Sequence, residues 1–160
     1  MSDLSKIPVT VITGFLGAGK TTLIRHLMQN PQGKRLAVLV NEFGDVGVDG
    51  DILKSCADEN CPVENIVELA NGCICCSLEG GLHSAIVRVL RSGARPEAIL
   101  IEASGVSNAG ELARILSDDA MRDFAYLELI VSTFDCDHWQ TCSEKERELI
   151  HSQLRYADVV

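Results

Sequence analysis

The feature that most constrains this chain is the glycine-rich stretch from Gly14 to Thr22, which reads GFLGAGKTT. An apolar run at residues 9–13 precedes it, and a helical pattern of apolar residues at 23–28 follows it. Strand, glycine-rich turn and helix in this order are the context in which G-x-x-x-x-G-K-[ST] forms a phosphate-binding loop. We therefore predict that the chain binds a nucleotide.

Each residue type in this loop has a chemical role. Glycines let backbone N–H groups turn toward an anion, and the start of the following helix adds a partial positive charge. Lys20 is expected to reach the β- and γ-phosphates, and the Thr21 hydroxyl is expected to bind Mg²⁺. The residues predicted to contact the nucleotide here are Gly14, Gly17, Ala18, Gly19, Lys20, Thr21 and Thr22.

Charge and composition exclude several classes of function. The 23 acidic and 14 basic residues give a net charge of −9, which argues against a nucleic-acid partner. The longest apolar runs are about five residues, too short for a membrane span, and the first residues lack a secretory signal. We expect a cytoplasmic protein whose seven cysteines are thiols or metal ligands rather than disulfides.

Strand-like and helix-like segments alternate along the chain. The expected strands are 7–13, 36–40, 66–69, 98–102 and 127–133. One expected helix follows the glycine-rich stretch and ends near 29, and three others cover about 82–90, 109–116 and 143–156. This alternation predicts an α/β fold, a three-layer P-loop NTPase with a mostly parallel sheet. Residues 158–160 read as a strand just begun, so we expect truncation before the last strands and a fragment of a longer protein.

A second candidate site is the sequence Asn-Gly-Cys-Ile-Cys-Cys at 71–76. Thiolates of Cys73, Cys75 and Cys76 converge on one ion if the backbone turns, and such soft ligands suit Zn²⁺, Co²⁺ or Cu⁺. The fourth ligand of a tetrahedral site has four weak candidates: Glu42, Asp45, His83 or water. Residues 136–142, which contain two further cysteines, are expected to form a polar loop around one packed aromatic side chain.

Four segments together, GFLGAGKTT, NEFGDVGVDGDIL, NGCICC and ILIEASG, resemble the CobW-type family of metal-handling GTPases from about Val9 to Val160. The resemblance implies that residues 1–160 are the N-terminal P-loop GTPase domain of a longer two-domain protein. It also implies GTP hydrolysis with Mg²⁺, and delivery of zinc or cobalt to a client protein, in cobalamin biosynthesis or zinc homeostasis. Homo-oligomerisation is left open.

The same resemblance assigns roles by position. Lys20 and Glu102 become catalytic, Gly105 faces the γ-phosphate, and the three cysteines match the family's CxCC metal motif. Glu102 replaces the usual aspartate, so it either holds Mg²⁺ through water or orients the attacking water. The guanine-reading motif [NTS]-K-x-D is absent from these 160 residues, so the base is not specified.

Two other functions fit parts of the pattern. A P-loop kinase for a small acceptor would need no thiolate metal site, whereas a zinc storage or sensor module would bind metal without nucleotide turnover. For the GTPase interpretation, we expect Mg²⁺–GTP to order the acidic segment at 41–51 and thereby assemble the cysteine site. Linkage then requires metal and nucleotide to tighten each other's binding by the same factor.

Overall fold

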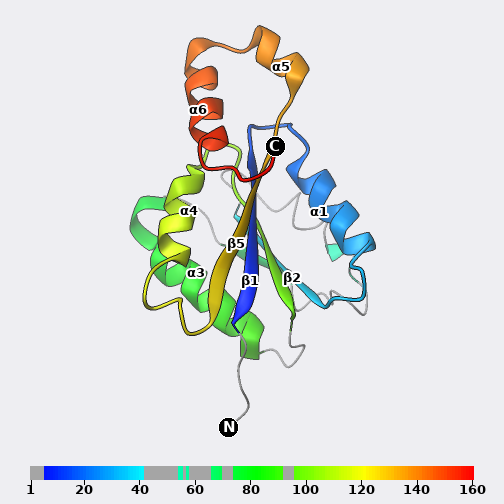
Figure 1. Cartoon of the computed structure of the whole chain (residues 1–160), viewed down its shortest axis with the longest axis vertical. Helices are drawn as coiled ribbons and strands as arrows, with labels where there is room; N and C mark the ends of the chain where they lie inside the picture. Colours follow the sequence, from blue (N-terminus) through cyan, green and yellow to red (C-terminus); the bar gives the residue numbers. More distant parts are fainter. Residues whose placement is uncertain (1–5, 42–53, 56, 58–65, 70–73, 92–95) are drawn as a thin grey trace.

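The computed structural model describes residues 6–41, 54–55, 57, 66–69, 74–91 and 96–160, with the side chains at 41, 67–69 and 74–80 left aside (Figure 1). The strands are β1 (Ile7–Gly14), β2 (Leu36–Asn41), β3 (Ile66–Leu69), β4 (Ala98–Glu102) and β5 (Ala125–Thr133). The helices are α1 (Lys20–Gln29), α3 (Ile74–Arg91), α4 (Ala109–Leu116), α5 (Cys136–Thr141) and α6 (Glu144–Leu154).

The five strands form one parallel sheet in the order β3-β2-β4-β1-β5. Since all pairs are parallel, every strand ends at the same edge of the sheet. The register aligns Ile12 of β1 with Glu102 of β4, and Gly14 of β1 with Thr133 of β5. The phosphate loop therefore lies beside the segments that follow β4 and β5.

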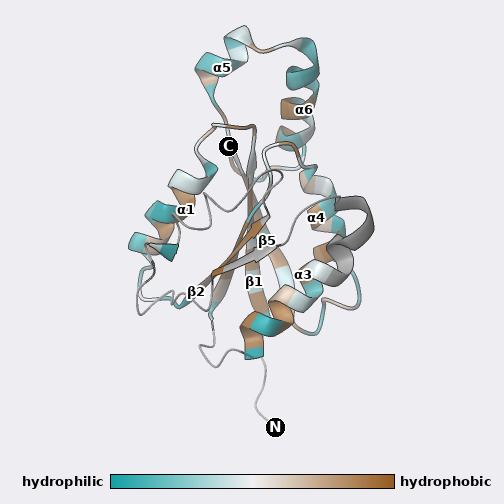
Figure 2. Cartoon of the chain, turned by 180° about the vertical axis from the view of Figure 1, so that it is seen from behind, coloured by the Kyte–Doolittle hydropathy of each residue, from teal (hydrophilic) through white to brown (hydrophobic). Residues whose placement is uncertain are grey.

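Two apolar cores occupy the two faces of the sheet. Successive residues of a strand point to opposite faces, so Val11 joins one core and Ile12 the other. Helix α1 covers one face through Ile24 and Met28, and α3 and α4 cover the other (Figures 1 and 2). The strands β2 and β4 are buried on both faces, as their continuous apolar runs predict. The predicted three-layer α/β P-loop fold is confirmed.

Helices α5 and α6 lie beyond the carboxyl edge of the sheet, at the top of Figure 1. Asp135 caps α5, with its Oδ1 accepting hydrogen bonds from the backbone N–H groups of residues 137 and 138. Ser143 and Glu146 form a reciprocal capping box at the start of α6. The hydrogen bond from the Ser143 hydroxyl is the main reason that the pKa of Glu146 lies below its usual 4.5. After α6, Val159 forms a parallel bridge with Val131 of β5, consistent with a strand beginning there.

Three details differ from the sequence-based expectations. Helix α3 begins at Ile74, so Cys75 and Cys76 belong to its first turn rather than to a turn before it. The expected polar loop at 136–142 contains the short helix α5. The pattern of apolar residues predicts that Leu149, Ile150 and Leu154 form the core face of α6. Ile150 is buried as expected, but Leu149 and Leu154 are half-buried, and the second buried residue of the helix is Gln153.

Candidate nucleotide-binding site

The phosphate loop connects the end of β1 to the start of α1. Gly17 and Gly19 have φ angles of 76° and 95°, in the left-handed region that side-chain-bearing residues rarely adopt. Gly14, with φ 137°, lies so close to Thr133 of β5 that a Cβ has no room. Ala18 donates its backbone N–H to the Phe15 carbonyl oxygen at 3.2 Å, which closes the turn. The loop conformation therefore depends on glycine at the positions that the motif specifies.

Lys20 and Thr21 lie at the first positions of α1, where backbone N–H groups point out of the helix. Within α1, no side chain caps these groups and no acidic residue occupies the first turn. Lys20 is only 7% exposed, and its Nζ donates to the Phe15 carbonyl oxygen at 3.0 Å. The helix start thus offers a buried cation and backbone donors to an anion.

Glu102 completes this arrangement from the end of β4. Its Oε1 accepts a hydrogen bond of 2.7 Å from the Thr21 hydroxyl, although the two residues are 81 positions apart in sequence. Glu102 is 4% exposed, so its carboxylate lies within the protein at the base of the loop. The structure brings together the three residues that the sequence singles out for phosphate and Mg²⁺ chemistry.

Gly105 packs directly against the phosphate loop. A Cβ at this position would lie 2.6 Å from Leu16 Cδ2 and 2.8 Å from the Leu16 backbone nitrogen. The carbonyl of Gly105 accepts a 3.0 Å hydrogen bond from Gln153 Nε2 of α6. Sequence reasoning did not find Gln153, because a glutamine within a helical pattern carries no signal of burial.

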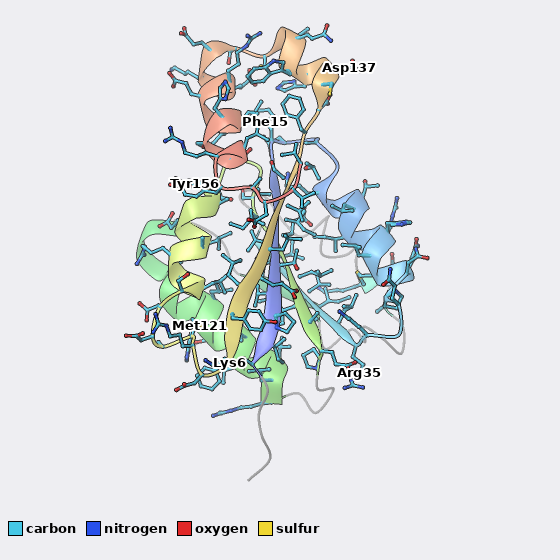
Figure 3. The ribbon with its side chains drawn as sticks, viewed as in Figure 1. Lys6, Phe15, Arg35, Met121, Asp137 and Tyr156 are labelled. Atoms are coloured by element: carbon cyan, nitrogen blue, oxygen red, sulfur yellow. The ribbon has the colours of Figure 1, made fainter. Side chains whose placement is uncertain are left out.

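An aromatic contact joins the loop to α5. The rings of Phe15 and His138 are stacked with centroids 4.9 Å apart and planes 13° apart. Figure 3 shows Phe15 directly below the α5–α6 pair. Also on α5, the Trp139 indole forms a T-shaped contact with the His151 imidazole, with ring centroids 5.2 Å apart, and the Arg147 guanidinium lies 4.9 Å from the centroid of the indole. Helices α5 and α6 are therefore packed together and against the loop.

The remaining predicted residues fall elsewhere. Thr22 is exposed on α1. Glu42, Asp45 and Cys73 lie outside the described residues, and Cys75 and Cys76 are described only as backbone in the first turn of α3. The rings of His83 and Phe124 form a T-shaped contact with centroids 5.6 Å apart. Over the part of the chain that the structure describes, no three His, Cys, Asp or Glu residues form a metal-binding cluster.

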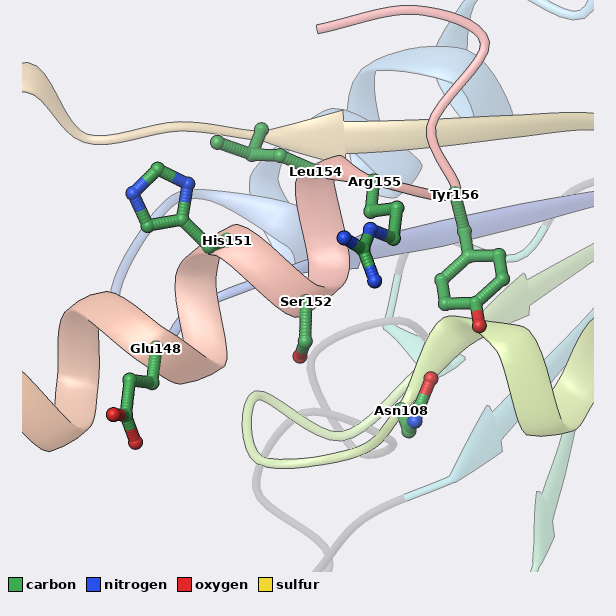
Figure 4. Close-up of a pocket in the computed structure, with 7 residues that line it drawn as sticks. All are labelled: Asn108, Glu148, His151, Ser152, Leu154, Arg155 and Tyr156. Atoms are coloured by element: carbon green, nitrogen blue, oxygen red, sulfur yellow. The ribbon is translucent and has the colours of Figure 1, made fainter.

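A pocket of about 770 Å³ lies between α6 and the start of α4 (Figure 4). Its lining combines charged, polar and aromatic side chains: Asn108, Glu148, His151, Ser152, Leu154, Arg155 and Tyr156. None of these is a predicted site residue. The pocket is separate from the phosphate loop, which remains the candidate nucleotide site.

Comparison with known proteins gives the family. A model of the CobW/HypB/UreG nucleotide-binding domain matches residues 8–160. The chain belongs to this family. The match includes the phosphate loop, Glu102 and Gly105, as well as the cysteines at 73–76, so it supports the resemblance to CobW-type metallochaperone GTPases that these motifs suggest.

Two similar proteins have names that describe a function. A zinc chaperone CobW from Sinorhizobium sp is 46% identical over 134 residues, which cover 84% of this chain and 38% of that protein. A zinc-regulated GTPase metalloprotein activator 1 from Schizosaccharomyces pombe is 38% identical over 98% of this chain and 38% of its own length. This chain therefore spans well under half of either relative.

A solved structure has the same fold. A Zn(II)-bound triple mutant of the YjiA GTPase matches with a TM-score of 0.65 and 26% identity, over 97% of this chain and 48% of that one. Its three substitutions replace one glutamate and two adjacent cysteines with alanine. Among the described residues of the present chain, no helix is both long and apolar enough to span a membrane.

Proposed function

We propose that this chain is the GTP-hydrolysing part of a metallochaperone that binds a thiophilic metal ion at Cys73, Cys75 and Cys76 and delivers it to a client protein. The observation that supports the nucleotide-binding part of the proposal is the 2.7 Å hydrogen bond from Thr21 to Glu102, at the same helix start where Lys20 is buried and donates to the phosphate loop. Membership of the CobW/HypB/UreG family and the names of the relatives support GTP as the nucleotide and zinc as the cargo.

The oxygen atoms of the candidate nucleotide site are suitable ligands for Mg²⁺. Thr21 Oγ1 and Glu102 Oε1 are hard oxygen ligands only 2.7 Å apart, and Mg²⁺ prefers oxygen and retains several waters. Thr21 would bind the ion directly, and Glu102 would hold it through water, because its carboxylate already contacts the threonine hydroxyl. When bound, Mg²⁺ would neutralise charge that develops on the phosphate oxygens.

The residues of the chain provide the rest of the chemistry. Lys20 would donate to β- and γ-phosphate oxygens in place of the Phe15 carbonyl, because its ammonium already lies against the loop. Backbone N–H groups of the loop and of the first turn of α1 would hold the same anion. Gly105 would face the γ-phosphate from the segment after β4. Such positioning and electrostatics account for most catalysis of phosphoryl transfer, and the intrinsic rate should be slow without a partner.

The metal is cargo rather than a resident cofactor. Thiolates bind zinc and cobalt alike, and the names of the relatives favour zinc. The cysteines follow β3, whose carboxyl end is three strand spacings, or about 14 Å, from that of β1. Strand β2 lies between β3 and β4, so the acidic segment that follows β2 starts between the two sites. Nucleotide-dependent ordering of that segment would transmit the state of GTP to the cysteines.

Zinc titrations of the intact protein with Mg²⁺ and either GDP or a non-hydrolysable GTP analogue test the proposal. We expect zinc affinity to differ by about 5- to 150-fold between the two nucleotides, the usual range of allosteric coupling. Equal affinities would refute the coupling. Zinc-independent phosphate transfer from Mg²⁺–nucleotide to a small acceptor would support a kinase instead, and stoichiometric zinc without turnover would support a storage or sensor module.

Variants separate the two halves of the proposal. When each ligand is measured without the other, Cys75→Ala should weaken zinc binding and leave GTP binding almost unchanged, whereas Lys20→Ala should do the reverse. Cys136→Ala is the matched control, because Cys136 is an exposed thiol at the start of α5. Loss of both activities in either of the first two variants, with a normal unfolding transition, would contradict the layout of two separate sites.

A further inference from the structure

A buried amide on α6 has no role in the function proposed above. Gln153 is fully buried, yet it belongs to a helix whose other polar residues are mostly exposed or half-buried. Its Nε2 donates to the carbonyl oxygens of Gly105 at 3.0 Å and Ser107 at 3.3 Å. Both acceptors belong to the segment that follows β4. One side chain thus holds two points of the segment that adjoins the phosphate loop.

The orientation of this amide follows from its surroundings. Two carbonyl oxygens face the same end of the side chain, and only the NH₂ group donates hydrogen bonds. The other end, Oε1, is buried and accepts no hydrogen bond from the described residues. An unsatisfied buried acceptor offsets much of what the two donated bonds contribute to stability. The main effect of Gln153 is therefore to fix where the segment lies.

The segment held in this way is in contact with the phosphate loop. Gly105 approaches Leu16 so closely that even a methyl group would overlap the Leu16 backbone nitrogen. Within the segment, the Ser107 backbone N–H donates to the Ser104 carbonyl oxygen at 3.0 Å, and the Val106 N–H lies 3.4 Å from the Ser104 hydroxyl. A shift of the Gly105 carbonyl would therefore move the whole turn relative to the phosphate loop.

We propose that Gln153 is a positioning residue for the reaction, which holds the Gly105–Ser107 turn against the phosphate loop so that Gly105 meets the γ-phosphate. This inference rests on the proposed function. A diphosphate lacks the group that Gly105 would face, so Gln153 should affect the triphosphate selectively. A residue that served only the stability of the fold would affect both nucleotides equally.

The test compares dissociation constants of GDP and a non-hydrolysable GTP analogue, with Mg²⁺, for the intact protein and two variants. Gln153→Met keeps the side-chain length and removes both donated bonds. We expect the affinity for the analogue to fall about five- to tenfold, the range for one or two buried hydrogen bonds, and that for GDP to change less than about twofold. Ser152→Ala is the control: it removes a bond of the same helix, to the Leu149 carbonyl, and should change neither affinity.

The outcomes distinguish this inference from the proposed function. An unchanged preference for the analogue over GDP in folded Gln153→Met would overturn the inference alone. Failure of the wild-type protein to bind either nucleotide would overturn both. If Gln153→Met does not fold, Gln153→Asn replaces it, because this variant keeps the amide but is one methylene too short for the two carbonyls. Hydrogen exchange of the wild-type protein adds a check that needs no variant. The backbone amides of residues 106 and 107 should be protected from exchange before nucleotide is added. Exchange of these amides at the rate of an unstructured peptide would contradict the inference.

Discussion

Replacing Gly105 with alanine tests the contact between the post-β4 turn and the phosphate loop. The added Cβ would lie 2.6 Å from Leu16 Cδ2 and 2.8 Å from the Leu16 backbone nitrogen. The leucine side chain is 58% exposed and can rotate away, but the backbone nitrogen cannot. Restoring an ordinary contact therefore requires the phosphate loop or the turn to move by about half an ångström.

Overpacking of this kind costs about 1–3 kcal/mol. For a chain of this size, that cost lowers the melting temperature by about 3–10 °C. Because the displaced atoms belong to the phosphate loop, the affinity for a GTP analogue should also fall by about tenfold or more. Thermal unfolding followed by circular dichroism, together with equilibrium nucleotide binding, measures the two effects.

Gly81→Ala is the matched control for this substitution. Gly81 lies in the interior of α3, is exposed, and has no atom within 4 Å of the Cβ that alanine would add. The same chemical change should stabilise the protein there by about 0.5–1 kcal/mol, because alanine favours the helix. Nucleotide affinity should stay constant. If Gly105→Ala were as stable as Gly81→Ala and bound the analogue as tightly, the described contact would be wrong.

Two further predictions concern the helices around the site. Asn108 caps α4 by accepting a hydrogen bond from the Gly110 backbone N–H at 2.9 Å, so Asn108→Ala should lower the free energy of unfolding by about 1 kcal/mol, measured by thermal unfolding. Ser117→Ala is the control: it removes an exposed hydrogen bond to the Ala113 carbonyl at the other end of α4 and should lower the same free energy by less than about 0.5 kcal/mol. Glu146 has a lowered pKa, so its carboxylate stabilises the folded chain above its usual pKa of 4.5, and this contribution is lost as the pH falls through the lower folded value. Glu146→Gln should flatten the acid side of a plot of melting temperature against pH, and an unchanged slope would exclude this carboxylate as its source.

Much of the geometry of the candidate nucleotide site could be predicted from the sequence. The spacing of the motif fixes the loop, and adjacency along the chain places Lys20 and Thr21 at the start of a helix. The approach of Glu102 follows from topology, because parallel strands end at one edge and β4 is next to β1. Local chemistry and a simple parallel sheet were enough to bring these three residues together.

Other features of the structure depend on tertiary packing and could not be predicted from local sequence patterns. Helix α5 has six residues, too few for a helical period to be recognised, and only the capping aspartate before it gives a local signal. Gln153 interrupts the apolar face of α6, so its burial depends on two carbonyls that are 46 and 48 residues away along the chain. The cysteine site at 73–76 remains a prediction from spacing and family.

The aromatic cluster on α5 gives this protein a built-in optical probe. Trp139 is the chain's single tryptophan, and its indole contacts the Arg147 guanidinium and the His151 imidazole of α6. The residue before it, His138, stacks on Phe15 of the phosphate loop. Indole emission is sensitive to such neighbours, so any nucleotide that tilts α5 against α6 changes the intrinsic fluorescence. For such a nucleotide, rapid-mixing kinetics of binding can be followed without attaching a dye.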